Sequence, residues 1–146
     1  MDEISIEDRT ALQDAMTAYC LAADSLSDMD ALLDIFTEDA VLDMGAMGTT
    51  LNGHDEMRAF YTGVFDTMAH NAHILTNFRV NRFDGDSASA QAYVVAIGRT
   101  KTGDEMTLYV RHFKDFIRTD SGWKCYKFAS APLLPLPVRL TENAEE

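Results

Sequence analysis

The stretch HNAHILTN, residues 70–77, holds two of the four histidines of the chain. It opens a run of alternating side chains that is typical of a β-strand, and strand residues three positions apart point to opposite faces. His70 and His73 are therefore predicted not to bind one metal ion together. Because His54 and His112 add no recognisable ligand spacing, the sequence predicts no metal site.

The patterns of covalent catalysis and of nucleotide binding are also missing. The chain has no Gly-x-Ser-x-Gly elbow, phosphate loop or dinucleotide fingerprint. Cys20 and Cys125 have no histidine nearby in sequence, and we interpret both as small apolar residues of a reduced compartment. What remains is acid–base chemistry by carboxylates, a histidine and a tyrosine, for which no cofactor is predicted.

The elements that must position these groups fall into two halves. The first half has the period of amphipathic helices, which predicts helices over 6–25, 29–36 and 57–68, with a strand at 38–44 between the last two. From His70 the period changes to two, and turns at DGD, KTGDE and TDSG divide this half into four consecutive antiparallel strands.

Three helices followed by a strand meander indicate an α+β fold whose sheet curls around its helices. Such a sheet leaves a conical cavity that is open at one end, the kind of concave apolar site that small ligands prefer. We predict one domain over 1–131 and an extended tail over 132–146, which contains all three prolines.

The composition excludes several classes of partner. With 24 acidic and 12 basic residues the formal net charge is -12, which opposes nucleic acid as a partner. No apolar run is long enough for a membrane span, and the N-terminus MDEISIEDRT lacks the features of a secretory signal. The expected protein is soluble and cytoplasmic, with no membrane partner.

Four segments together resemble a known family: residues 18–44, 53–65, 73–80 and 113–128. They are similar to the SnoaL-like branch of the nuclear transport factor 2-like superfamily, over about Asp8 to Phe128. The resemblance implies a cone-shaped, cystatin-like α+β barrel in which three N-terminal helices pack in a strongly curved, mostly antiparallel sheet. It also implies a homodimer or homotrimer.

Within this superfamily the chain resembles a first group of cofactor-free enzymes: hexachlorocyclohexane dehydrochlorinase, scytalone dehydratase and bile-acid dehydratase. Their His–Asp dyad removes a proton next to a leaving group, and Asp24 and His73 fall at the corresponding places. Tyr19 precedes Asp24 by five residues, as a tyrosine does in the bile-acid enzyme. The arginine on the last strand of the dehydrochlorinase has no counterpart here, so Arg111 or Lys127 would have to stabilise the departing group.

The second group that the chain resembles is ketosteroid isomerase. Tyr19 and Asp43 correspond to its tyrosine and its base, whereas Arg111 stands where that enzyme has a protonated aspartate on a late strand. An arginine could still stabilise an enolate, but with a different hydrogen-bonding scheme.

The alternating pattern of the strand that begins at His70 leaves a further alternative open. His73 faces solvent while Ile74 lies on the buried face, unless a bulge changes the direction of these side chains.

We therefore predict a cofactor-free lyase that abstracts a proton from a small apolar or aromatic, ring-containing substrate. The leaving group is open: water, halide or a carbon fragment released by a retro-aldol-like cleavage. The predicted catalytic residues are His73, Asp24, Tyr19 and Arg111, and the predicted substrate-binding residues are Asp43, Phe60, Val64, Tyr109 and Lys127. The alternatives are a double-bond isomerase using Asp43, a noncatalytic protein that binds an apolar ligand, and a pure oligomerisation module.

Overall fold

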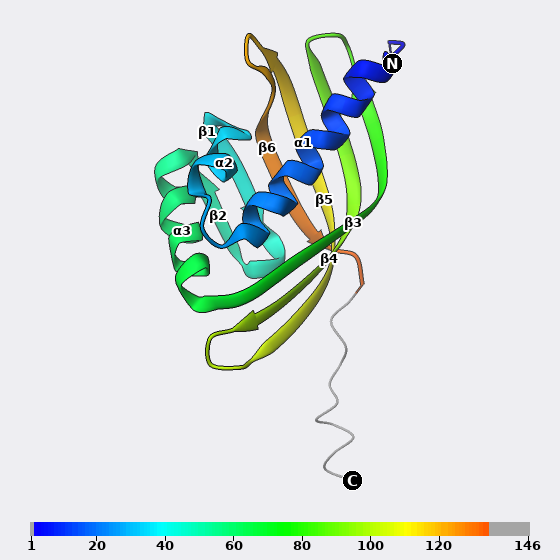
Figure 1. Cartoon of the computed structure of the whole chain (residues 1–146). Coiled ribbons are helices and arrows are strands. Elements are labelled where there is room, and N and C mark those ends of the chain that lie inside the picture. The colour runs from blue at the N-terminus through cyan, green and yellow to red at the C-terminus, as the bar shows by residue number, and fades with distance from the viewer. Residues whose placement is uncertain (1, 135–146) are drawn as a thin grey trace.

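The computed structural model describes residues 2–134 (Figure 1). Along the chain the elements are α1 (Ile6–Ser25), α2 (Met29–Asp34), β1 (Phe36–Met44), the short 3-10 helix η1 (Gly45–Met47), β2 (Thr49–Asn52), α3 (Gly53–Thr67), β3 (Met68–Phe83), β4 (Ser87–Thr100), β5 (Glu105–Thr119) and β6 (Gly122–Pro132). The predicted tail lies, from residue 135 onward, outside the described residues and stays a prediction.

One six-stranded sheet organises the molecule, in the order β2-β1-β6-β5-β4-β3. The four strands β3 to β6 pair antiparallel with their neighbours in sequence, as predicted. β1 runs parallel to β6, which makes the sheet mixed. The predicted α+β fold with a strongly curved, mostly antiparallel sheet is confirmed, but β2 and β3 are free edges, so the sheet does not close into a full barrel.

Helix α1 crosses one face of the sheet, with α2 and α3 beside it (Figure 1). Its bounds are the predicted ones, because Ser5 caps the first turn by accepting a hydrogen bond from the backbone N–H of Asp8 at 3.0 Å. The buried stripe of the helix includes Leu12, Met16 and Tyr19. No helix within residues 2–134 combines the length and apolar character needed to cross a membrane.

The segment between α2 and α3 differs from its prediction. Asp28 caps α2 by accepting from the N–H of Ala31. Residues 49–52, read in part as turn residues from the sequence, form the short edge strand β2 against β1. Helix α3 begins at Gly53, four residues before the predicted start.

Strand β3 is long and irregular, and this irregularity decides which side chains face the helices. Its register against β4 shifts at three places, one of them between Thr76 and Arg79, where Asn77 has a φ of 56°. Such a bulge bends a strand and reverses the alternation of its side chains. His73 and Phe78 are consequently both turned inward, whereas Ile74 is 51% exposed. The alternative in which Ile74 is buried and His73 faces solvent is thereby ruled out.

Candidate active site

A cavity of about 400 Å³ opens between α3 and the strands β3, β4 and β5. Its lining is largely apolar and includes four of the eight methionines, Met44, Met47, Met68 and Met106. Tyr19, Phe60 and Val64 also line the cavity. Methionine side chains adapt to irregular ligands, and a few polar groups among them suffice to orient one.

His73 brings its ring to the wall of this cavity and is held there by Asp24. One carboxylate oxygen of Asp24 lies 2.5 Å from Nδ1 of His73, and the other accepts the backbone N–H of His73 at 2.9 Å. The partner comes from the last turn of α1, 49 residues earlier in sequence. With Nδ1 engaged, Nε2 is the ring nitrogen left for a substrate, so the pair has the arrangement of an oriented general base.

A second polar feature of the wall is a pair of phenols. The hydroxyls of Tyr19 on α1 and Tyr61 on α3 lie 2.7 Å apart, both side chains are buried, and both residues line the cavity. Burial raises the pKa of both tyrosines well above the usual value, so both are neutral at physiological pH. Two hydroxyl protons are available and one is used within the pair, which leaves one donor for a substrate oxygen.

Behind Tyr19 the sheet contributes two buried polar side chains from β5. His112 is 3% and Lys114 1% exposed. Burial, reinforced by the nearby charge of Lys114, lowers the pKa of His112 well below the usual value. Burial likewise lowers the pKa of Lys114 to about 8. His112 is thus a buried histidine of the sheet, whereas Lys114 was not recognised from the sequence.

Two predicted residues of β5 point the other way. Side chains alternate along a strand, and because His112 and Lys114 face inward, Arg111 and Tyr109 face outward. The guanidinium of Arg111 lies over the ring of Tyr93, 5.2 Å from its centroid, and Tyr109 is 49% exposed. The expectation that these two residues contact the substrate is therefore not supported by their positions.

Asp43 on β1 and Lys127 on β6 are also exposed and do not line the cavity. Their neighbours Leu42, Met44 and Phe128 take the inward positions instead, and alternation places the two charged side chains outside. The isomerase hypothesis therefore has no base at Asp43 that faces the cavity. Of the predicted site residues the structure brings together Asp24, His73, Tyr19, Phe60 and Val64.

The candidate site residues that sequence reasoning missed are Tyr61 and Lys114. Tyr61 lies on the apolar stripe of α3, and nothing local in the sequence shows that its hydroxyl contacts that of Tyr19. Lys114 did leave a signal: it occupies an inward position in the alternation between His112 and Phe116, where a lysine is unusual.

Comparison with known proteins agrees with this architecture. Residues 5–128 match the family described as SnoaL-like domain. An uncharacterised protein of Mycobacterium tuberculosis (strain H37Rv) is 30% identical over 122 residues, which cover 82% of this chain and 81% of the relative. The chain belongs to the SnoaL-like domain family, as the four segments predicted.

Two solved structures extend the comparison. A protein from Novosphingobium aromaticivorans that is provisionally named an aromatic ring hydroxylase is 46% identical, with a TM-score of 0.89 over 95% of this chain and 98% of its own. A hexachlorocyclohexane dehydrochlorinase is 20% identical, with a TM-score of 0.76 over 90% of this chain and 92% of its own. The likeness to the dehydrochlorinase shows that the two proteins share a fold.

Proposed function

We propose that the protein is a cofactor-free lyase that eliminates a leaving group from a small, apolar, ring-containing substrate. His73 removes the proton, Asp24 orients and supports the histidine, and Tyr19 with Tyr61 donates a hydrogen bond to the substrate. The observation that carries the proposal is the 2.5 Å contact between Nδ1 of His73 and Asp24 at the wall of an apolar cavity. A general base held in this way typically contributes about 10²- to 10⁴-fold to the rate.

The two related structures suggest where to look for substrates. One name concerns an aromatic ring and the other a chlorinated ring, and a cavity of about 400 Å³ with Phe60 and Val64 in its wall suits such a ring. A panel of cyclic compounds with a C–H bond next to a carbonyl or leaving group should therefore be screened by mass spectrometry. Loss of water or of a hydrogen halide indicates elimination, unchanged mass with a moved double bond indicates isomerisation, and added oxygen indicates hydroxylation.

The dyad is then tested with an identified substrate. His73→Ala and Asp24→Asn are each expected to lower kcat by at least about 10²-fold. His70→Ala is the matched control, because His70 lies on the same strand but is exposed and outside the cavity. Full turnover in the first two variants would refute the proposal. A ligand that binds tightly without reacting would favour the noncatalytic binding protein.

The state of the histidine ring gives a test that needs no substrate. Nitrogen NMR of the ring reports which nitrogen carries the proton, and we expect Nδ1 of His73 to carry it in the native protein. Asp24→Asn removes the acceptor charge and should change this pattern. An identical spectrum in the variant would show that Asp24 does not control the ring.

A further inference from the structure

The ammonium group of Lys114 has no hydrogen-bond partner among the residues that the structure describes, although the residue is only 1% exposed. Burying an unpaired charge is costly. Lysine side chains normally avoid the cost by extending to solvent. Lys114 instead points from the middle of β5 toward α1, where its Nζ lies 4.0 Å from the ring centroid of Tyr19.

The groups around Lys114 leave its charge uncompensated. Nζ also lies 4.7 Å from the ring centroid of Phe128. The other titratable groups that act on it are the thiols of Cys20 on α1 and Cys125 on β6, and burial raises the pKa of these thiols to about 11 and about 12. His112, on the same strand, stays neutral because its pKa is lowered. Within this described shell, a lone cation faces neutral rings and neutral thiols.

The position of this cation connects it to the cavity. The Lys114 ammonium contacts the face of the Tyr19 ring, and Tyr19 also helps to line the cavity. The hydroxyl of Tyr19 in turn contacts that of Tyr61 at 2.7 Å. In a medium of low dielectric constant, a positive charge at this range favours negative charge on the phenol pair and on an atom bonded to it.

We propose that Lys114 is a positioning residue whose charge, acting through Tyr19, stabilises negative charge on a substrate oxygen bound by the Tyr19–Tyr61 pair. The inference rests on the proposed lyase function and narrows its substrates to rings that carry a carbonyl or enolisable oxygen. It assigns to a buried lysine the charge-stabilising role that the outward-facing Arg111 cannot perform in this cavity.

The chemistry balances without another reactant. His73 takes the proton from the carbon next to the carbonyl, and the C–H electron pair moves onto the carbonyl oxygen to give an enolate. The tyrosine pair donates a hydrogen bond to that oxygen while Lys114 compensates its charge. The electrons then return and expel the leaving group from the adjacent carbon. The leaving group departs with the proton held by His73, and the products are a conjugated double bond, the protonated leaving group and neutral histidine.

The test uses p-nitrophenol as an optical probe of charge on a bound oxygen. Its phenol and phenolate forms have different absorption bands, so the ionised fraction of the bound probe can be followed as a function of pH. In the native protein the bound probe should ionise at a lower pH than in Lys114→Met, with a difference of at least about one pH unit. Lys114→Gln, which keeps a polar side chain without the charge, should behave like Lys114→Met.

Lys101→Met is the matched control, because Lys101 is exposed in the β4–β5 turn, and it should give the native curve. Equal ionisation of the probe in native protein and in both Lys114 variants would overturn the proposal. If the probe does not bind, pentafluorophenol replaces it, because this phenol ionises below pH 8, where Lys114 is still charged. Its fluorine NMR shifts report its charge, and it must ionise at a lower pH in the native protein than in Lys114→Met; equal ionisation in the two proteins would also overturn the proposal.

Asp24→Asn separates this inference from the proposed function on which it rests. The substitution leaves Lys114 and the tyrosines in place and removes a negative charge that helps to raise the pKa of Tyr19. The probe should therefore ionise at a pH no higher than in the native protein, even though turnover is lost. Loss of turnover in Asp24→Asn together with no effect of Lys114 on the probe would refute only the role of Lys114. Full turnover in Asp24→Asn together with the expected effect of Lys114 on the probe would refute only the dyad.

Discussion

At the scale of single residues, Lys114 destabilises the folded protein and lies beside the candidate site. Its pKa is about 8 in the folded protein, against an ordinary value of 10.5, because burial disfavours the charged form. Between these two pH values the unfolded chain holds a proton that the folded chain has released, so stability rises with pH across this window. Below about pH 8, burial of the charged lysine lowers the free energy of unfolding by the full amount, on the order of 3 kcal/mol.

Lys114→Met is therefore expected to stabilise the protein at pH 7, by up to about 3 kcal/mol, in contrast to most core substitutions. Urea unfolding at pH 7 and at pH 10 measures the effect, and the gain should shrink at the higher pH because native Lys114 is then largely neutral. Lys101→Met should change neither value. A destabilised Lys114→Met at pH 7 would show that the lysine contributes more by packing over the rings than its charge costs.

Site residues are predicted correctly from the sequence when a suitable residue type also occupies a position that faces the cavity. The resemblance brought Asp24 and His73 together across 49 residues, and their contact is now described. Arg111 and Asp43 were assigned from the resemblance to ketosteroid isomerase, although the alternation of their strands could have placed both outside. Tyr61 could not be assigned, because its contact with Tyr19 depends on how α3 packs beside α1.

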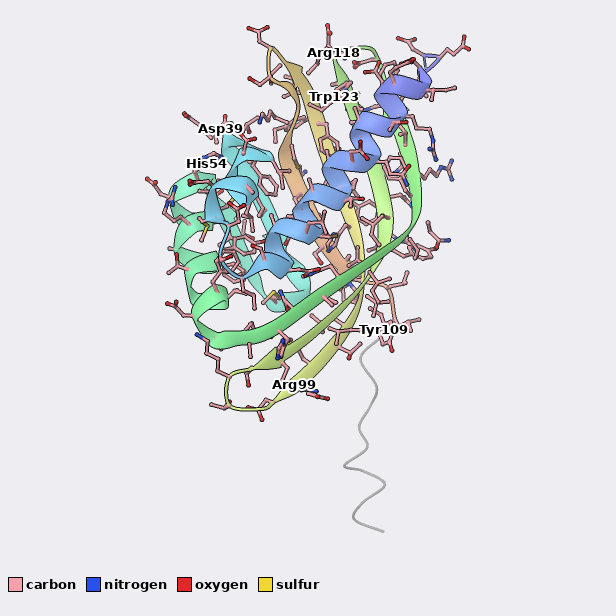
Figure 2. The ribbon with its side chains drawn as sticks, in the orientation of Figure 1. Asp39, His54, Arg99, Tyr109, Arg118 and Trp123 are labelled. Carbon is pink, nitrogen blue, oxygen red and sulfur yellow. The ribbon has the colours of Figure 1, made fainter. Side chains whose placement is uncertain are left out.

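At the scale of elements, the N-terminus of α1 is fastened to the sheet through Asp8. Arg118 donates two hydrogen bonds to its carboxylate, each 3.0 Å long, and the indole N–H of Trp123 donates a third at 3.2 Å. Figure 2 shows Arg118 and Trp123 together near this end of the helix. Because α1 also carries Tyr19 and Asp24, the contact helps to fix the angle at which the site residues enter the cavity.

Asp8→Asn is expected to lower Tm by a few degrees. The hydrogen bonds from Arg118 are the main cause of the lowered pKa of Asp8. A carboxyl whose pKa is lower in the folded state stabilises the fold above its ordinary value of 3.8, and this contribution disappears as the pH falls through the lower folded value. Thermal unfolding from pH 7 to pH 2 should therefore show the two proteins converging at the acid end.

Asp14→Asn, an exposed change on the same helix, is the control for the loss of one negative charge. If it lowers Tm as much as Asp8→Asn does, net charge and not the contact with Arg118 explains the effect.

The second element-level feature is the close approach of β4 to β3 at Gly98. A Cβ atom at this position would collide with the end of the Met68 side chain and lie 3.2 Å from the amide oxygen of Asn71. Both neighbours line the cavity. Gly98→Ala should therefore push Met68 into the cavity and weaken binding of p-nitrophenol several-fold, as measured by absorbance titration, with a modest change in stability because a methionine end is flexible.

Gly63→Ala is the matched control, since Gly63 also lines the cavity but an added Cβ there meets no atom within 4 Å. It should keep the affinity and raise the free energy of unfolding by about 0.5–1 kcal/mol, because alanine is the better helix residue. Unchanged binding by Gly98→Ala would show that the rim between β3 and β4 does not limit access to the cavity.

A helix or strand can be predicted from the sequence when the residues within it or next to it indicate where it begins and ends. A cap at Ser5 and a regular apolar stripe indicate helix α1 in the sequence, and its predicted bounds are those observed. The bulge at Asn77 has no such signal, although asparagine tolerates a positive φ better than most residues. That single irregularity turns His73 inward along with Phe78. Strand β2 is four residues long and exists only by pairing with β1, so its sequence alone resembles a turn.

At the scale of the whole molecule, chain order explains where the site lies. The helices lie against one face of the curved sheet that the meander forms (Figure 1). A cavity remains between α3 and the strands β3, β4 and β5. The family resemblance and the strand pattern therefore predicted the architecture well. They could not show that the sheet stays open at β2 and β3, because closure depends on the edge strands and not on the period of any one strand.

The same curvature leaves an outer sheet face with apolar side chains on neighbouring strands. Ile74, Val95 and Tyr109 are cross-strand neighbours in a row over β3, β4 and β5, which we call the outer-face row. Ile74 is 51% and Tyr109 49% exposed, and Figure 2 places Tyr109 on the side of the strands away from α3. Neighbouring exposed apolar residues of this kind favour contact with another protein surface.

We expect this face to join copies of the chain into a homodimer or homotrimer, so the double variant Ile74→Glu, Tyr109→Glu should have the mass of a monomer in sedimentation experiments. Leu21→Glu is the control, because Leu21 is 66% exposed on α1, away from the row, and it should keep the native mass.

The net charge of -12 makes copies repel one another, and salt screens that repulsion. Association of the native protein should therefore strengthen between low and physiological ionic strength. A monomeric native protein at both ionic strengths, or a double variant with the native mass, would contradict the expectation and leave the outer-face row without a role in self-association.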